Sequence, residues 1–308
     1  MNDKLEDASG VIEDVEQLLS RAEYRKALGL CEAVQLRESL PSKFWFLKAR
    51  ALEGLGEKRS AIEAYRCEIA SLKRVPPDLL GQIGSLLLDL GEYIEGAICL
   101  DQSCEIAPSP DRLILLASAF FRSGRPELAR EAIRRAIDLA PDNDEAWNNL
   151  GAYNLASTPF EAEKAFRRAL EINPARSSSY GGLALAYIAQ GKTKEAVDAA
   201  REGLERNPLE GSCYLAVGKG EEIQGDLESA KDAYSKAFRC DFDKRSALLG
   251  ILRTLEKQGR LSEALDWHLR GVRAWPGDTE IRNAYTTFAE THKGVLAQRP
   301  LITDKSGS

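Results

Sequence analysis

Small residues recur along this chain at a nearly constant spacing. Successive steps between them are 34, 35, 33, 33, 34, 34 and 34 residues, at Ala27, Ala61, Gly96, Ala129, Ala162, Ala196, Ala230 and Ala264. A period in the mid-thirties indicates one supersecondary unit repeated in tandem. This feature constrains the fold most, because a single unit of this kind buries its apolar face only by stacking on its neighbours.

Two further residue types follow the same period. Prolines recur at steps of 33, 33 and 34 residues, at Pro108, Pro141, Pro174 and Pro208. Glycines lie five residues before the small residues, at Gly56, Gly91, Gly124, Gly191, Gly225 and Gly259. The fifth unit lacks this glycine and has a shortened turn at Ser157–Pro159. Three residue types with one period predict about eight copies of the unit.

Residues 144–174 show what one unit is. An N-cap is expected at Asp142 or Asp144, and Trp147 and Leu150 then begin an apolar face at helical spacing. A second apolar series follows the turn, at Ala162, Ala165, Phe166, Ala169, Leu170 and Ile172. The unit is therefore predicted to be a helical hairpin, in which Gly151 and Ala162 allow the two backbones to approach closely.

The pattern W-x2-L-G followed by A-x3-F-x2-A and a terminal proline resembles the tetratricopeptide repeat family. In the fifth unit it is carried by Trp147, Leu150, Gly151, Ala162, Phe166, Ala169 and Pro174. Similar sets begin at Trp45, Tyr180 and Tyr214. The resemblance covers about residues 8 to 278 and is weakest in the first and last units.

The resemblance implies an all-α fold, a right-handed superhelical solenoid of about eight helix-turn-helix hairpins with a C-terminal capping helix. The units are expected at about 8–41, 42–76, 77–109, 110–143, 144–176, 177–210, 211–244 and 245–278. Residues 1–7 are expected to be a flexible N-terminus and 298–308 a disordered tail. The capping helix is expected at 279–297, where apolar residues from Ile281 to Phe288 fall at helical spacing.

Composition argues against several classes of function. The formal net charge is −6 and the sequence pI is about 5.3, whereas nucleic-acid binders normally present a basic face. No apolar run approaches the roughly 20 residues that span a bilayer, and the first ten residues are too polar for a signal peptide. We therefore expect a cytoplasmic protein that binds neither nucleic acid nor membrane.

The sequence offers little for catalysis or metal binding. Its six cysteines form no CxxC pair, and we expect them to be free thiols, most of them small buried side chains. His268 falls at the aromatic core position of its hairpin, and His292 lies near the tail. Phosphate loops and nucleophile–base motifs do not appear. We predict no catalytic residue, no metal site and no cofactor, and hence no enzyme.

In proteins that resemble this family, the first helix of each hairpin lines a concave groove. The exposed groove residues stand one, two, five and eight places after the leading Trp, Tyr or Leu. Transferred to this chain, the pattern predicts partner-binding residues at Arg50, Gln82, Ser85, Ile114, Leu115, Ser118, Phe121, Asn148, Asn149, Ala152, Gly181, Gly182, Leu185, Ile188, Lys219 and Arg253. Glu53, Glu222 and Glu256 fall at further positions of the same pattern.

Two alternatives stay open for these residues. From Ile114 to Ile188 the set is mostly apolar or small, with Arg50 on one flank and Lys219 and Arg253 on the other. Such a composition suits a partner interface, but the apolar residues would also suit packing between neighbouring first helices. Gly181 and Gly182 equally fit room for a ligand backbone or close helix packing.

We expect a non-catalytic adaptor that binds a peptide or helical segment of a partner protein in the concave groove. The alternatives are a self-associating scaffold, which would form a homo-oligomer, and a regulatory subunit of an enzyme complex. Basic residues on second helices alternate with acidic ones and predict a mutually neutralised surface, at Arg125, Arg130, Arg134, Arg135, Lys164, Arg167 and Arg168.

Overall fold

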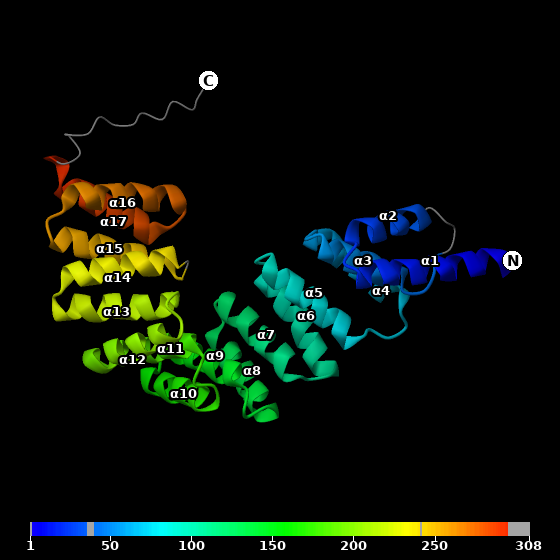
Figure 1. Ribbon diagram of the computed structural model, residues 1–308, viewed down its shortest axis with the longest axis horizontal. Coiled ribbons are helices and arrows are strands. Elements are labelled where there is room, and N and C mark those ends of the chain that lie inside the picture. The colour runs from blue at the N-terminus through cyan, green and yellow to red at the C-terminus, as the bar shows by residue number, and fades with distance from the viewer. Residues whose placement is uncertain (1, 36–39, 241, 295–308) are drawn as a thin grey trace, which may run out of the picture. The chain divides into compact units, whose positions relative to one another are not determined.

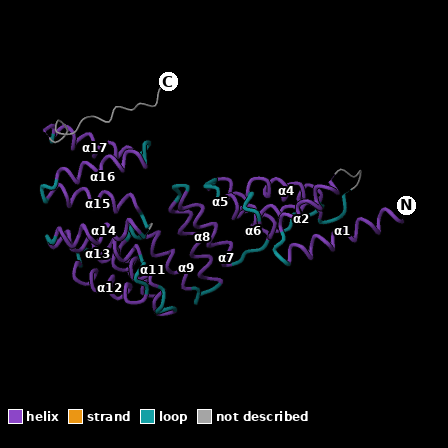
Figure 2. Tube along the Cα trace, turned by 45° about the horizontal axis from the view of Figure 1, so that its top comes forward, coloured by secondary structure: helices purple, strands orange, loops and turns teal. Residues whose placement is uncertain are grey.

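A computed structural model of the chain describes residues 2–35, 40–240 and 242–294 (Figure 1). Over these residues it contains seventeen helices and no strand (Figure 2). The predicted all-α solenoid of helical hairpins is confirmed. The chain divides into two compact units, Met1–Pro141 and Asp142–Ser308.

The first unit holds four helical hairpins. Its helices are α1 (Asn2–Ser20), α2 (Tyr24–Gln35), α3 (Phe44–Gly54), α4 (Lys58–Ser71), α5 (Pro77–Asp89), α6 (Tyr93–Ile106), α7 (Pro110–Arg122) and α8 (Pro126–Leu139). Helix α1 begins within the segment 1–7, for which the sequence predicted a flexible terminus. Odd-numbered helices are the first helices of their hairpins and even-numbered ones the second.

The second unit holds four more hairpins and a last single helix. Its helices are α9 (Asp144–Asn154), α10 (Pro159–Ile172), α11 (Ser177–Ala189), α12 (Thr193–Arg206), α13 (Gly211–Gln224), α14 (Leu227–Arg239), α15 (Lys244–Lys257), α16 (Leu261–Ala274) and α17 (Thr279–Thr291). Helix α17 packs on α16 through Ile281 and Phe288, which are buried. The predicted tail at 298–308 lies outside the described residues.

The glycines that lie five residues before the small residues end the first helices. All six have a positive φ, between 70° and 88°, which L-residues with a side chain rarely adopt. The fifth hairpin makes its shorter turn without glycine, and Pro159 starts α10 as its first residue. The N-cap of α9 is Asn143, not Asp142 or Asp144, and its Oδ1 accepts a hydrogen bond from the Ala146 amide at 2.9 Å.

The small residues form the contact between the two helices of a hairpin. Ala162 and Ala230 are completely buried, and each is followed one turn later by an aromatic side chain that fills the core. In the fifth hairpin this side chain is Phe166, and a Cβ atom added to Gly151 would lie only 2.8 Å from its ring. The glycine of the first helix therefore makes room for the aromatic ring of the second.

Candidate partner-binding surface

We call the sixteen predicted partner-binding residues the first-helix surface. Seven of them belong to the first unit, on α3, α5 and α7: Arg50, Gln82, Ser85, Ile114, Leu115, Ser118 and Phe121. The other nine belong to the second unit: Asn148, Asn149, Ala152, Gly181, Gly182, Leu185, Ile188, Lys219 and Arg253. The continuous central segment predicted from Ile114 to Ile188 is thus divided between the two units, and each part has its own environment.

The apolar residues of the first unit differ in burial. Ile114 belongs to the core, with 6% of its surface exposed. Leu115 is half-buried, and Phe121 is exposed by 42%. Ser85 and Ser118 are half-buried as well. Leu115 and Phe121 are the apolar members of this set that solvent reaches.

The polar residues of the first unit centre on Glu53. Its carboxylate accepts a hydrogen bond from the Tyr65 hydroxyl at 2.8 Å and another from the Gln82 side-chain amide. Burial raises the pKa of Tyr65, and the bond to Glu53 raises it further, so the phenol stays protonated and donates. Gln82 is therefore held by the chain itself, while Arg50 is exposed.

Gly181 and Gly182 in the second unit are closely packed. A Cβ atom on Gly182 would collide with the ring of Phe166, and one on Gly181 would collide with Ser212 at the start of α13. Both glycines are buried. Of the two interpretations left open by the sequence, close packing against neighbouring helices is the one that these contacts support.

Leu185 and Ile188 on α11 remain partly exposed. Both lie against a buried cluster that includes Phe166 and Tyr187, yet neither is buried as fully as these residues are. On α9, Ala152 is exposed and Asn149 is half-buried. The neighbouring Asn148 accepts a hydrogen bond from the Ser179 hydroxyl at 2.9 Å and thereby joins α9 to α11.

Glu222 on α13 organises the charges of the second unit. It accepts hydrogen bonds from the Tyr234 hydroxyl at 2.8 Å, from Arg253 at 3.1 Å and from Lys257 at 2.9 Å. Burial alone would raise the pKa of Glu222, but these three donors outweigh it and hold the pKa at about 2. Arg253, predicted as a charged residue on the flank of the site, is therefore bound to a carboxylate of the same chain.

Lys219 lies one turn before Glu222 on the same helix. It is half-buried, and burial lowers the pKa of its ammonium group, an effect that Asp243 and Glu222 partly offset. No hydrogen bond or ion pair joins it to the described part of the chain. The second unit thus presents an apolar pair on α11 and a cation on α13, the helix that packs directly against it.

A pairing rule links these carboxylates to the core. In three hairpins a donor at the aromatic position meets a glutamate twelve residues earlier: Tyr65 with Glu53, Tyr234 with Glu222, and His268 with Glu256 at 2.9 Å. Three other hairpins have apolar residues at both positions: Leu100 with Leu88, Ile133 with Phe121, and Ala200 with Ile188. The fifth hairpin, whose turn is shorter, departs from this pattern, because Asn154 stands twelve residues before Phe166. Sequence reasoning missed this rule, although the spacing was visible.

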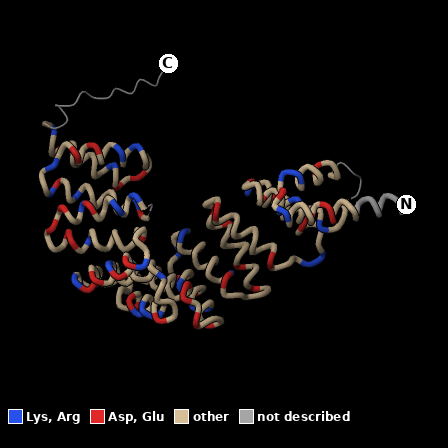
Figure 3. Tube along the Cα trace, in the orientation of Figure 1, with Lys and Arg blue, Asp and Glu red and all other residues tan. Residues whose placement is uncertain are grey.

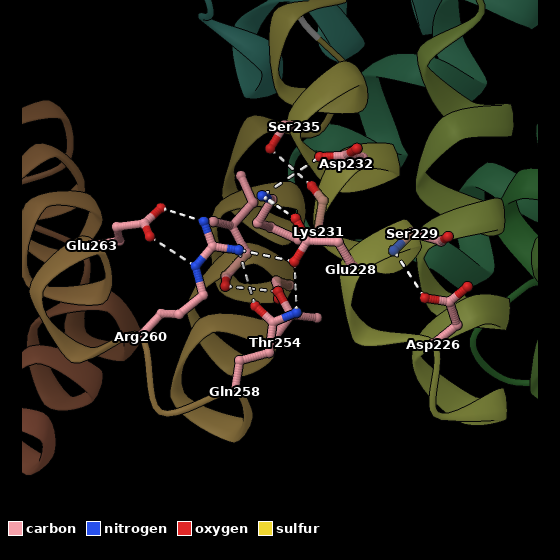
Figure 4. A network of polar contacts seen from close by, with 12 residues as sticks. Asp226, Glu228, Ser229, Lys231, Asp232, Ser235, Thr254, Gln258, Arg260 and Glu263 are labelled. Carbon is pink, nitrogen blue, oxygen red and sulfur yellow. Dashed lines mark hydrogen bonds and ion pairs between the residues drawn. The ribbon is translucent and has the colours of Figure 1, made fainter.

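Most second helices contain both basic and acidic residues (Figure 3). Glu161 pairs with Lys164 at 2.8 Å, and Glu163 pairs with Arg167 at 3.0 Å. In Figure 4, Glu228 of α14 accepts hydrogen bonds from Arg260 at 2.9 Å and from Gln258 at 3.0 Å. Arg260 also holds Glu263, so this network joins α14 to the next hairpin.

Reactive groups are few and packed. All six cysteines are free, and burial raises the pKa of Cys31 to about 11 and that of Cys213 to about 12, which keeps these thiols protonated. Cys31, Cys104 and Cys213 are buried, Cys99 and Cys240 are half-buried, and Cys67 is exposed. Among the described residues, no three His, Cys, Asp or Glu side chains gather as a metal site would require. His268 is completely buried and packs against Phe288, with ring centroids 4.6 Å apart.

These features define a tandem helical-hairpin repeat protein. Family models described as tetratricopeptide repeat match residues 77–110, 110–153, 160–210 and 223–279, more than half of the chain. The chain belongs to the tetratricopeptide repeat family.

Solved structures with the same fold include a thermophilic TPR protein of Thermus thermophilus, at 20% identity, 59% coverage of this chain, 99% of that chain and a TM-score of 0.54. The C-terminal part of a TPR repeat-containing protein of Cytophaga hutchinsonii is 16% identical, with 78% and 98% coverage and a TM-score of 0.58. A chain of the APC/C hetero-tetramer Cut9-Hcn1 is 12% identical, with 90% and 55% coverage and a TM-score of 0.64.

No curated protein matches the chain by sequence. Tetratricopeptide repeats are in general non-catalytic scaffolds that bind protein or peptide partners, and the repeats support a protein-interaction role for this chain. In the described part of the chain, no helix combines the length and the apolar character needed to cross a bilayer.

Proposed function

We propose that this protein is an adaptor whose first-helix surface in the second unit holds a peptide or helical segment of a partner protein. The observation that carries the proposal is the partly exposed pair Leu185 and Ile188, with Lys219 on the adjoining helix. An apolar pair suits a ligand that is held by burial, and a neighbouring cation that makes no hydrogen bond or ion pair with a described residue suits one that is oriented by charge.

The size of this apolar pair limits how it acts. Full burial of a leucine or isoleucine contributes about 1.5–3 kcal/mol, and Leu185 and Ile188 are already half-buried. Micromolar affinity requires about 8 kcal/mol. A partner segment must therefore also contact neighbouring first helices, where Asn149 and Ala152 of α9 and Lys219 of α13 supply further positions.

The test is Leu185→Lys in the full chain. A partner is first captured from a lysate with the wild-type protein and identified by mass spectrometry, and its purified form is then titrated. We expect about tenfold or greater weakening by Leu185→Lys, with circular dichroism and melting temperature close to wild type. Leu115→Lys tests in the same way whether the first-helix surface of the first unit binds the partner.

Leu209→Lys is the matched control, because Leu209 is 76% exposed and lies in the turn between α12 and α13. It should leave affinity unchanged. A large fall in melting temperature for Leu185→Lys would show that this leucine is core. If both Leu185→Lys and Leu115→Lys bind the partner with unchanged affinity, the binding site is not the first-helix surface.

A further inference from the structure

The outer face of α6 breaks a pattern that the other second helices keep. The residues two places before and two places after the small residue point outward in each hairpin. From α4 onward these pairs are Arg59 and Glu63, Ile94 and Ile98, Glu127 and Glu131, Phe160 and Lys164, Lys194 and Asp198, Glu228 and Asp232, Ser262 and Asp266. Only α6 has two large apolar side chains there, and they are 55% and 53% exposed.

The hairpin fold does not require these two isoleucines. In α4 and α8 the same two positions hold charged residues, and both helices are complete. Isoleucine is also a weaker helix former than glutamate, lysine or arginine at an exposed site. Exposed apolar side chains that neighbouring copies replace with charges suggest a contact with another molecule.

Charge continues the stripe that the isoleucines begin. Ile94 and Ile98 are one turn apart, and Asp101, Gln102 and Glu105 follow on the same side of the helix. Helix α6 contains no basic residue. Neither Asp101 nor Glu105 has an ion pair with any described residue.

The acidic residues near the other end of α6 are already compensated. Glu92 pairs with Arg59 at 2.5 Å, and Glu95 pairs with Arg66 at 3.4 Å. The uncompensated charge therefore lies in the C-terminal half, where the helix dipole adds further negative potential. The stripe from Ile94 to Glu105 is apolar in one half and acidic in the other, and Ile106, the last residue of α6, is also exposed, by 45%.

We propose that the outer face of α6 is a second docking surface, which takes a helix with two apolar residues one turn apart and two basic residues two to three turns further along. The stripe from Ile94 to Glu105 is about 16 Å long at 1.5 Å per residue, which matches three turns of such a helix. An acidic face of this kind repels the anionic surface of a membrane. This docking surface is independent of the first-helix surface.

The test uses a displayed library of 20-residue helix-forming peptides selected on the full chain. Enriched peptides should carry two apolar residues four apart and Lys or Arg seven to eleven residues from the first of them. Their affinity is compared between wild type and the double variant Ile94→Arg, Ile98→Glu, which gives α6 the residues of α4. We expect the double variant to bind about tenfold or more weakly, with an unchanged melting temperature.

Two further variants separate the sources of binding. Asp101→Lys with Glu105→Lys should reverse the preference from basic to acidic peptides. Leu139→Arg is the matched control, since Leu139 is 52% exposed on α8 and should not affect binding. Peptides whose affinity falls in Leu185→Lys belong to the first-helix surface and are assigned to the proposed adaptor function.

Several results would overturn the proposal. These are no enrichment above scrambled peptides, enriched peptides that bind the double variant equally well, or enrichment of acidic sequences in the wild type. A lower melting temperature of the double variant would make the isoleucines structural. Light scattering that shows a dimer in wild type and a monomer in the double variant would assign the face to a second copy of this chain.

Discussion

The hairpins α9–α10 and α13–α14 place an aromatic ring in the same way but present different surfaces. Phe166 lies between Gly151 of its own hairpin and Gly182 of the next one, and Tyr234 lies between Gly218 and Gly250. The two rings differ by one hydroxyl group. Around Phe166 the packing is apolar, whereas the Tyr234 hydroxyl donates to Glu222.

The hydroxyl group of Tyr234 affects the charges on the first-helix surface. A buried phenol needs an acceptor, and the carboxylate that supplies it must be compensated in turn. Glu222 meets this need and is compensated by Arg253 and Lys257 of the next hairpin. In this hairpin the core tyrosine is thus accompanied by a charged group on the first helix. In the α11–α12 hairpin, Ala200 is accompanied by the apolar Ile188 at the equivalent position.

The largest expected effect on stability comes from filling the space that each ring occupies between its two glycines. Gly182→Leu places a side chain into the ring of Phe166, and Gly250→Leu does the same to Tyr234, whose ring lies 2.6 Å from an added Cβ. Each substitution should lower the free energy of unfolding by about 3 kcal/mol, measured by urea denaturation.

Gly29→Ala is the control with the opposite sign. Gly29 lies inside α2, and an added Cβ meets nothing within 4 Å. This substitution should stabilise the protein by about 0.5–1 kcal/mol. If Gly182→Leu were tolerated equally well, Phe166 would not be fixed between the two glycines.

The second-largest expected effect distinguishes the α13–α14 hairpin, which contains Glu222, from the α9–α10 hairpin. Glu222→Gln keeps an acceptor for Tyr234 but removes the charge that holds Arg253 and Lys257, and should lower the free energy of unfolding by about 1–2 kcal/mol at pH 7. Because the folded pKa of Glu222 is depressed to about 2, its contribution is present above pH 4.5 and is lost as the pH falls towards 2.

Urea denaturation between pH 4.5 and 2 checks this sign. The wild-type protein should lose stability more steeply than Glu222→Gln over that range. Parallel curves for the two proteins would mean that the carboxylate is not held by its three donors in the folded state.

The last complete hairpin provides a smaller, pH-dependent effect. Burial lowers the pKa of His268, and the bond to Glu256 only partly opposes this. The folded protein therefore favours neutral imidazole, so its stability falls as the pH drops from 7 through the unfolded pKa of about 6.5 towards 5. Glu256 on α15 and Tyr285 on α17 are the titratable groups that face the ring.

His268→Tyr converts this pair into the one that Tyr234 makes with Glu222. The variant should show a flatter dependence of unfolding free energy on pH between 7 and 5 than wild type, measured by urea denaturation. His292→Gln, which changes the other histidine of the chain, should leave the wild-type slope in place. Equal slopes for wild type and His268→Tyr would exclude His268 as its source.

The repeat spacing alone predicts most of the fold, because each small residue and turn glycine acts within its own hairpin. The candidate site is harder to predict, since its residues are occupied from the neighbouring hairpin. From the sequence, Gly182 fits ligand space and close helix packing equally, because Phe166, which packs against it, belongs to the preceding hairpin. The ion pair of Arg253 could not be predicted from its own hairpin, because its partner Glu222 is 31 residues away.

The smallest expected change is the most direct test of the comparison. Tyr234→Phe alone removes one of the three donors to Glu222 and leaves only Arg253 and Lys257. Glu222→Leu alone leaves the buried Tyr234 hydroxyl without its acceptor. Each single variant should therefore be destabilising. The double variant replaces both polar partners with apolar groups, as in the hairpins that pair Leu100 with Leu88. It should therefore be more stable in urea denaturation than the sum of the single variants predicts, while the loss of the charge that holds Arg253 and Lys257 remains.

The double variant also changes the surface while the fold is kept. Leu at position 222 leaves Arg253 and Lys257 without their carboxylate, so the second unit gains free positive charge beside Lys219. A partner segment with carboxylates should then bind more tightly and with a steeper dependence on salt concentration. If binding and its salt dependence stay as in wild type while stability is preserved, the pairing rule governs only the core and not what the first helices present.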